Sequence, residues 1–403
     1  MACNFLRRLL LECFGGELNN TNGNGNMSGS LLLRRFMLAC FGGEPQRTET
    51  SCEGSSGNTF IQLGLTRHMY GMFSMAVVGP PDNSQNEDRC QLVSGSLTDG
   101  VDGVFVGIYD GHGGTTCSQF VLDHLLNNFK GAIANQNGLI NAEVFQEAYH
   151  RTELMFVNHV RTNWHNKPQL AVLGSCCLVG VVFNNVLYVA NAGDSRAVLA
   201  RWPNGSGLDD MEVIQLSVDY NAKHIERRNE VCEEHPGTNL FPEGEGSFLL
   251  RGSIHVTRAI GHVYLKYEEF NRAPLPAEYI QEEPIVQPIV KAEPTVRTHQ
   301  LGPDDRFIIF ASDGLWDVMN NKQAADLVKN NPRNGAAAKL MREAMKITAS
   351  KYDMEEYHND MSIVILFFDN LQAPAPSAEN PLIDLNAFKE YHVTLFGANW
   401  SRE

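Results

Sequence analysis

Runs of apolar residues bounded by turn-forming residues predict several buried strands. The runs are rich in Val, Ile and Phe and lie at Met72–Val78, Val104–Tyr109, Cys177–Phe183, Val186–Ala190, Phe307–Ala311 and Ser362–Phe368. Asn184 and Asn185 separate two of these runs. Because asparagine tolerates positive φ, the pair predicts a tight hairpin between antiparallel strands.

Helices are predicted where apolar residues recur at spacings of three and four. Such patterns occur at Cys117–Phe129, at Val144–Phe156 and at Ala336–Ile347. The predicted helices follow blocks of strands instead of alternating with single strands. This order indicates an α+β fold in which helices cover antiparallel sheets.

The chain is expected to contain one mixed domain over residues 60–370, a leader over residues 1–59 and a tail over residues 371–403. Within the leader, FLRRLLLECFGGE (Phe5–Glu17) recurs as LRRFMLACFGGE (Leu33–Glu44). The Asn/Gly/Ser-rich stretch between the copies has too little apolar surface to fold alone. The leader is therefore read as two similar segments joined by a linker.

Two interpretations of the leader remain open. Each repeat combines an arginine pair with Leu, Phe and one cysteine, Cys13 or Cys40. This is typical of a short interfacial segment whose cysteine can be acylated, which would give peripheral membrane contact. The alternative is a disordered leader with two apolar patches.

Composition excludes several classes of protein. The 403 residues are 43% hydrophobic, and their formal net charge of −15 opposes nucleic-acid binding. Nine cysteines without a CxxC pair indicate a reduced, intracellular protein, and Cys176 and Cys177 are expected to act as small hydrophobes within an apolar run. No apolar stretch reaches the roughly 20 residues of a membrane span.

Acidic residues gather in short motifs, several of them at the ends of predicted strands beside glycine or other small residues. These residues are Glu87, Asp88, Asp110, Asp194, Asp313, Asp317 and Asp360. Clustered carboxylates repel one another unless a cation neutralises them. Mg²⁺ and Mn²⁺ prefer such oxygen ligands, whereas no Cys/His constellation in the sequence suggests zinc.

Five motifs in order, YDGHGG, NAGDSRAVLA, VTRAIG, ASDGLWDVM and NDMSIVILFF, resemble those of the type 2C (PPM) metal-dependent protein serine/threonine phosphatases. The segments GSCCLVG, LSVDYNA, EEFNR and NNPRNG are similar to the plant branch called clade D. The resemblance implies a sandwich of two antiparallel β-sheets flanked by helices, with a two-metal site at one end.

The resemblance also implies roles for the acidic residues. Asp110 would bridge two Mg²⁺ or Mn²⁺ ions, with the Gly111 carbonyl and Asp313 as further ligands. Glu87 and Asp88 would contact the ions directly or through water. Asn359 or Asp360 would supply the metal ligand of the last motif. A weaker third metal site would use Asp194, Asp313 and Asp317.

The implied reaction is hydrolysis of phosphoserine or phosphothreonine by a metal-bridging water. The ions lower the pKa of that water and neutralise the transferring phosphoryl group. His112 would protonate the leaving oxygen.

Three positions depart from the family pattern. Asn83 stands where many members have a phosphate-binding arginine, and His262 and Asn359 stand where aspartates are usual. Two functions therefore remain open: an active Mg²⁺/Mn²⁺-dependent phosphatase, or a catalytically weakened homologue that binds phosphoproteins or regulators.

The resemblance implies phosphoserine and phosphothreonine proteins as partners. Clade D resemblance further implies plant signalling: dephosphorylation of a plasma-membrane proton pump, restrained by small auxin-induced proteins. The expected location is the cytoplasm, the nucleus or both, with peripheral contact at the plasma membrane if the leader binds there.

Overall fold

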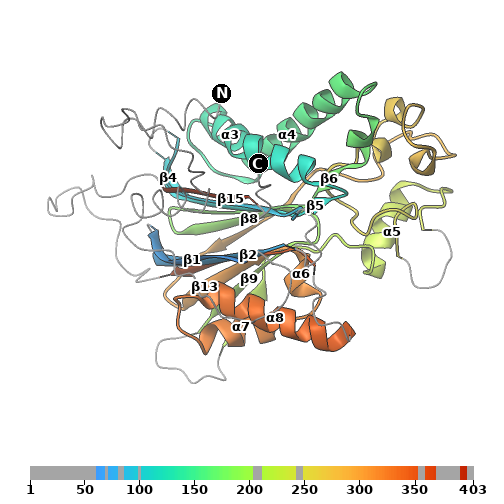
Figure 1. Ribbon diagram of the computed structural model, residues 1–403. Helices are drawn as coiled ribbons and strands as arrows, with labels where there is room; N and C mark the ends of the chain where they lie inside the picture. The colour runs from blue at the N-terminus through green and yellow to red at the C-terminus, as the bar shows by residue number, and fades with distance from the viewer. Residues whose placement is uncertain are drawn as a thin grey trace, which may run out of the picture. The chain divides into compact units, whose positions relative to one another are not determined.

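Two stacked antiparallel sheets form the centre of the molecule (Figure 1). The computed structural model describes residues 60–68, 71–79, 86–98, 101–202, 211–241, 248–352, 359–368 and 391–396, which fall within one compact unit. The predicted leader, with both repeats, and Asn83 lie outside the described residues. So does the predicted tail apart from residues 391–396.

Each large sheet has six strands. In spatial order, the first sheet contains β1 (Phe60–His68), β2 (Gly71–Val78), β14 (Met361–Phe368), β13 (Asp305–Ala311), β9 (Arg196–Arg201) and β10 (Glu212–Gln215). The second contains β12 (Thr295–Gln300), β8 (Val186–Ala192), β7 (Cys177–Phe183), β4 (Val101–Tyr109), β3 (Arg89–Thr98) and β15 (Tyr391–Phe396). All six predicted strands are confirmed.

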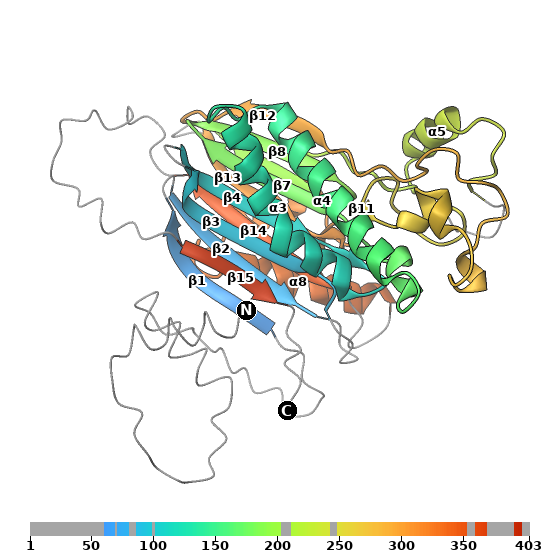
Figure 2. The same ribbon diagram turned by 90° about the horizontal axis from the view of Figure 1, so that it is seen from above.

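Helices cover the outer face of each sheet, as the sequence pattern predicts. Figure 2 shows α3 (Thr115–Asn135) and α4 (Ala142–Asn163) lying across the second sheet. On the opposite side, α6 (Asp313–Trp316), α7 (Asn321–Lys329) and α8 (Ala336–Tyr352) lie against the first sheet. The α+β sandwich is confirmed.

A smaller region extends from one end of the sandwich (Figure 2). It contains α5 (Ile225–Glu234) and the short 3₁₀ helices η3 (Val263–Leu265), η4 (Glu268–Phe270) and η5 (Ala277–Tyr279). Another 3₁₀ helix, η1 (Pro168–Val172), follows α4. No helix in the described part of the chain is long and apolar enough to cross a membrane.

The two sheets pack closely because a small residue of one sheet lies opposite a bulky residue of the other. A β-carbon at Gly180 in β7 would overlap the ring of Phe310 in β13. Asn184 and Asn185 have φ of 49° and 59°, and they join β7 to β8 as the predicted hairpin.

A three-stranded sheet brings together segments that are distant in sequence. It consists of β11 (Ile260–Gly261), β6 (Gly174–Ser175) and β5 (Gly111–His112) in that order. The pairing aligns His112 with Gly174. The end of β4 therefore lies beside the segment that enters β7.

Candidate functional site

Three aspartates that follow strands meet at one end of the sandwich. Asp110 follows β4, Asp194 follows β8, and Asp313 begins α6 directly after β13 and Ser312. One carboxylate oxygen from each lies within 4.8 Å of the others. The Asp313 amide also donates to Asp110 Oδ2 over 3.4 Å. The group has the oxygen donors that a hard divalent cation prefers.

Glycine is needed where two chain segments approach beside these aspartates. A β-carbon at Gly111 would lie 2.6 Å from the Glu87 carbonyl oxygen and 2.9 Å from Ser118 Oγ. One at Gly314 would overlap the Asp360 carbonyl. The glycines of YDGHGG and ASDGLWD therefore let the segments that contain Glu87 and Asp360 approach the aspartates.

A second set of acids comes from the segment before β3 and the segment before β14. Asp88 Oδ2 accepts a hydrogen bond from Ser312 Oγ over 2.7 Å, and Asp360 Oδ2 accepts one from the Glu87 amide over 2.7 Å. Asp88 Oδ1 and Asp360 Oδ1 are buried and have no hydrogen-bond partner among the described residues. A cation, or water held by a cation, would satisfy these oxygens.

Burial disfavours the ionised form of the clustered acids. It raises the pKa of Asp88 to about 6, against the hydrogen bond from Ser312. Burial, with repulsion from Asp88, raises the pKa of Asp360 to about 8. The pKa values of Asp110 and Asp313 also lie well above the usual range, because burial and neighbouring carboxylates act together. The donor set therefore fits Mg²⁺ or Mn²⁺, which would restore the charged forms.

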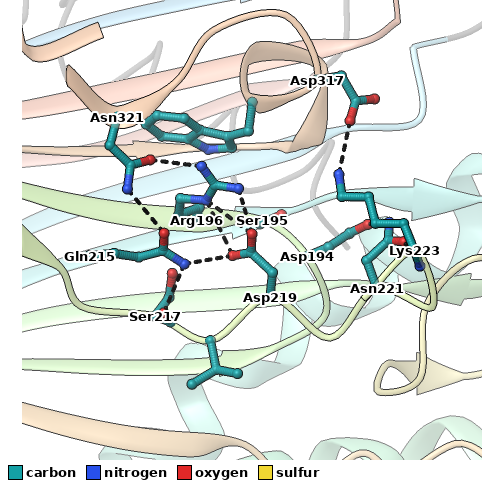
Figure 3. Close-up of polar contacts among 12 residues, drawn as sticks. Asp194, Ser195, Arg196, Gln215, Ser217, Asp219, Asn221, Lys223, Asp317 and Asn321 are labelled. Atoms are coloured by element: carbon teal, nitrogen blue, oxygen red, sulfur yellow. Dashed lines mark hydrogen bonds and ion pairs between the residues drawn. The ribbon is translucent and has the colours of Figure 1, made fainter. Parts of the chain in front are cut away.

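Asn359 and Asp317 lie at the edge of this site. Asn359 Nδ2 donates to Asp313 Oδ1 over 2.9 Å. Asp317 is exposed and pairs with Lys223 over 3.3 Å (Figure 3), outside the group formed by Asp110, Asp194 and Asp313. The structure thus brings Asp88, Asp110, Asp194, Asp313 and Asp360 to the site, places the Glu87 backbone beside Gly111 and Asp360, and leaves Asp317 at the rim.

A largely buried ion pair lies next to the turn that carries Asp194. The Arg196 guanidinium binds the Asp219 carboxylate, and their side chains are 13% and 8% exposed. Figure 3 shows Gln215 and Asn321 completing the network. The network links the start of β9, two residues after Asp194, to the start of α7.

His112 is oriented by a second histidine. His262 is 1% exposed, and its Nδ1 lies 2.8 Å from the Val172 carbonyl oxygen. Because a carbonyl only accepts, this nitrogen must carry a proton. Burial holds the pKa of His262 well below its usual range, so the ring is neutral and its Nε2 accepts from His112 Nδ1, 3.4 Å away.

The sequence pattern missed Cys176 as a site residue. Its Sγ lies 3.1 Å from Asp194 Oδ1 and 3.7 Å from His112 Nε2. Cys176 is buried, as expected for a small hydrophobic residue, but its sulfur has polar neighbours instead of apolar ones. The alternation of side chains along the adjoining strand was the available signal, since Cys176 and Cys177 must face opposite sides.

Comparisons with known proteins agree with this geometry. The model of the family described as protein phosphatase 2C matches residues 83–352. "Probable protein phosphatase 2C 79" of Arabidopsis thaliana is 39% identical over 357 residues, which covers 84% of this chain and 91% of that protein. "Probable protein phosphatase 2C 72" of Oryza sativa subsp. japonica is 40% identical over 332 residues, covering 78% and 83%.

A solved structure shares the fold. The serine-threonine phosphatase 2C from Toxoplasma gondii superposes with a TM-score of 0.58 at 18% identity, covering 78% of this chain and 100% of that chain. At this identity the likeness concerns the fold alone.

Proposed function

The chain belongs to the protein phosphatase 2C family of metal-dependent serine/threonine phosphatases, and on that premise we propose how its residues divide the work. Asp110, the Gly111 carbonyl and Asp313 would hold two ions, Mg²⁺ or Mn²⁺. The observation that carries this proposal is the approach of the Asp110, Asp194 and Asp313 carboxylates to within 4.8 Å. Such a group is unfavourable without a cation.

The remaining acids complete and tune the centre. Glu87, Asp88 and Asp360 would contact the ions directly or through water. The unpartnered oxygens of Asp88 and Asp360 support that role. Asn359 contacts Asp313 as a neutral member of the set. Asp194, Asp313 and Asp317 form a weaker third site, which Lys223 opposes by its ion pair with Asp317.

Bound ions supply a water of lowered pKa and neutralise charge on the phosphoryl group. The doubly protonated form of His112 then donates a proton from Nε2 to the leaving serine or threonine oxygen. Its side chain is 25% exposed, so substrate can reach it, and Nε2 lies 3.8 Å from Asp110 Oδ1. Burial lowers the pKa of His112, and attraction to Asp194 opposes this shift and favours the protonated donor.

Asp110→Asn tests the metal centre. We expect hydrolysis of a phosphothreonine peptide in saturating Mn²⁺ to fall by orders of magnitude, because the substitution removes the charge shared by both ions. Asp102→Asn is the matched control, since Asp102 is exposed and lies on β4, the strand that leads into Asp110. Near-native turnover by the Asp110 variant would refute the proposed centre.

A second function is favoured by His262 and Asn359, which stand where the family pattern has aspartates. The chain would then be a weakened homologue that binds phosphoproteins without turning them over. The same peptide assay separates the two functions: Mn²⁺-dependent hydrolysis that EDTA abolishes supports the enzyme, whereas phosphopeptide binding without hydrolysis supports the second.

Similarity to clade D supports a finer proposal about partners. On this basis the substrates include a plasma-membrane proton pump in plant signalling, and small auxin-induced proteins restrain the activity. The repeated basic and apolar segments of residues 1–59 are proposed to provide peripheral contact with the membrane. Dephosphorylation of that pump by the purified chain, with and without such a regulator, tests the first part.

A further inference from the structure

A second group of metal-ligating atoms adjoins the three carboxylates and shares Asp110 with them. It consists of a carboxylate oxygen of Asp110, Nε2 of His112 and Sγ of Cys176, all within 4.8 Å of one another. His112 Nε2 lies 3.7 Å from the sulfur and 3.8 Å from Asp110 Oδ1. Carboxylates alone suit hard cations, whereas an imidazole with a thiolate suits zinc and other softer metals.

The histidine pair directs a lone pair into this second group. His112 Nδ1 donates to His262 Nε2, so neutral His112 carries its proton on Nδ1. The other nitrogen, Nε2, is therefore unprotonated and faces Cys176 and Asp110. Histidine ligands of zinc are commonly held in this way by a partner on the second ring nitrogen.

Backbone contacts fix the spacing of the three ligands. The Cys176 amide donates to the Asp110 carbonyl oxygen over 2.8 Å, and His112 pairs with Gly174 between β5 and β6. A β-carbon at Gly174 would overlap the His262 ring. Both the sulfur and the imidazole are thus placed by the small sheet and not by flexible side chains alone.

We propose that Asp110, His112 and Cys176 form an inhibitory binding site for zinc. Tetrahedral zinc with ordinary bond lengths separates sulfur from nitrogen by about 3.6 Å and nitrogen from oxygen by about 3.4 Å. The observed separations, 3.7 and 3.8 Å, need adjustments of no more than about 0.4 Å. Asp194 Oδ1 lies 3.1 Å from the sulfur and outside this group of three, so water would complete the tetrahedron.

Binding replaces a proton with a metal. The Cys176 thiol donates to Asp194 Oδ1 in the metal-free protein, and the thiolate is the form that binds zinc. The S–H bond breaks, one proton passes to solvent, and a Zn–S bond forms without any change in oxidation state.

Zinc in this site would exclude the catalytic ions. Asp110 cannot bridge two Mg²⁺ or Mn²⁺ ions while it ligates zinc, and His112 cannot donate a proton while its Nε2 is bound. This exclusion rests on the proposed roles of Asp110 and His112. Zinc binding itself does not.

Cobalt(II) substitution tests the site without an activity assay. Metal-free, full-length protein with one equivalent of Co²⁺ should show a sulfur-to-cobalt charge-transfer absorption, which excess Mn²⁺ should remove. Cys176→Ser should abolish the absorption and weaken Zn²⁺ binding by more than about 100-fold, beyond the usual loss for an outer-sphere change. Cys232→Ser, which alters an exposed thiol, should retain both the charge-transfer absorption and the Zn²⁺ affinity.

Three results would count against the proposal, and two of them would overturn it entirely: no charge-transfer absorption in the wild-type protein, or the same absorption in Cys176→Ser. If Cys176→Ser does not fold, Cys176→Ala and the wild-type measurement still decide the matter. An absorption that persists in excess Mn²⁺ would disprove the shared ligand. A protein that shows the absorption but hydrolyses no phosphopeptide would contradict the proposed function and leave the zinc site standing.

Discussion

Replacing Asn359 with aspartate tests how the last acidic motif contributes to the metal centre. The substitution removes the donor to Asp313 Oδ1, which costs about 1 kcal/mol. It also adds a like charge, and two charges about 4 Å apart repel by about 4 kcal/mol at an effective dielectric constant of about 20. Residue 359 is exposed, so solvent screens most of this repulsion. We expect the metal-free variant to lose about 1–2 kcal/mol of unfolding free energy, or about 2–3 °C in Tm for a domain of this size.

The same charge becomes favourable when a dication is present. We expect the apparent Mn²⁺ affinity of Asn359→Asp to rise about tenfold, equivalent to about 1.4 kcal/mol. Thermal unfolding in EDTA and at increasing Mn²⁺ measures both effects, and peptide hydrolysis at limiting Mn²⁺ measures the consequence. Asn127→Asp, an exposed substitution on α3 with the same change in charge, is the control.

Asp360→Ala provides the opposing test. Asp360 accepts from the Glu87 amide, whereas Asn359 contacts Asp313, so we expect the alanine variant to change Mn²⁺ affinity less than Asn359→Asp does. The reasoning fails if Asp360→Ala abolishes metal-dependent turnover while Asn359→Asp changes nothing. Asp360 would then be the ligand, and the motif would be displaced by one residue.

Three further predictions concern stability and location. Arg196→Ala should lower the unfolding free energy by about 3 kcal/mol, because it leaves the Asp219 carboxylate buried and unpaired; chemical denaturation measures this, and Arg196→Lys should recover part of it. In EDTA, the unfolding free energy should fall as pH rises from about 4 to about 8. The pKa values of Asp88 and Asp360 are raised to about 6 and about 8 in the folded state. Over this pH range the folded state therefore binds more protons than the unfolded state, and it loses stability as those protons leave. Saturating Mn²⁺ should reverse that trend in Tm. Deleting residues 1–50 should release the protein from membranes without altering peptide hydrolysis, and an unchanged distribution on fractionation would leave only the disordered-leader interpretation.

Apolar patterning predicts the strands with buried faces and misses those whose sequences are mixed. The run Phe307–Ala311 is continuous and was identified, whereas β3 (Arg89–Thr98) and β12 (Thr295–Gln300) alternate with polar residues or lie at a sheet edge. Their pairing comes from neighbours distant in sequence, which a local pattern does not contain.

In the site, too, some features could be predicted from the local sequence and others could not. Asp110 and Asp313 each follow an apolar strand, and strands that share a sandwich bring their ends together, so clustering could be predicted. The position of Cys176 depends on the register of β6 against β5, and the partner of Arg196 lies on a loop between β10 and α5. Neither relation has a signature in the local sequence.

Two of the three departures from the family pattern, at positions 262 and 359, act on one quantity, the negative charge of the metal centre. The resemblance implies that Asn359 and His262 each stand where an aspartate is usual, which would leave the site with two fewer negative charges. Repulsion and burial already raise the pKa values of Asp110 and Asp313. Each additional carboxylate would destabilise the metal-free fold and, through the same interaction, strengthen binding of a dication. Because His262 is 1% exposed and position 359 is exposed, restoring aspartate at 262 should cost the metal-free protein more stability than restoring it at 359.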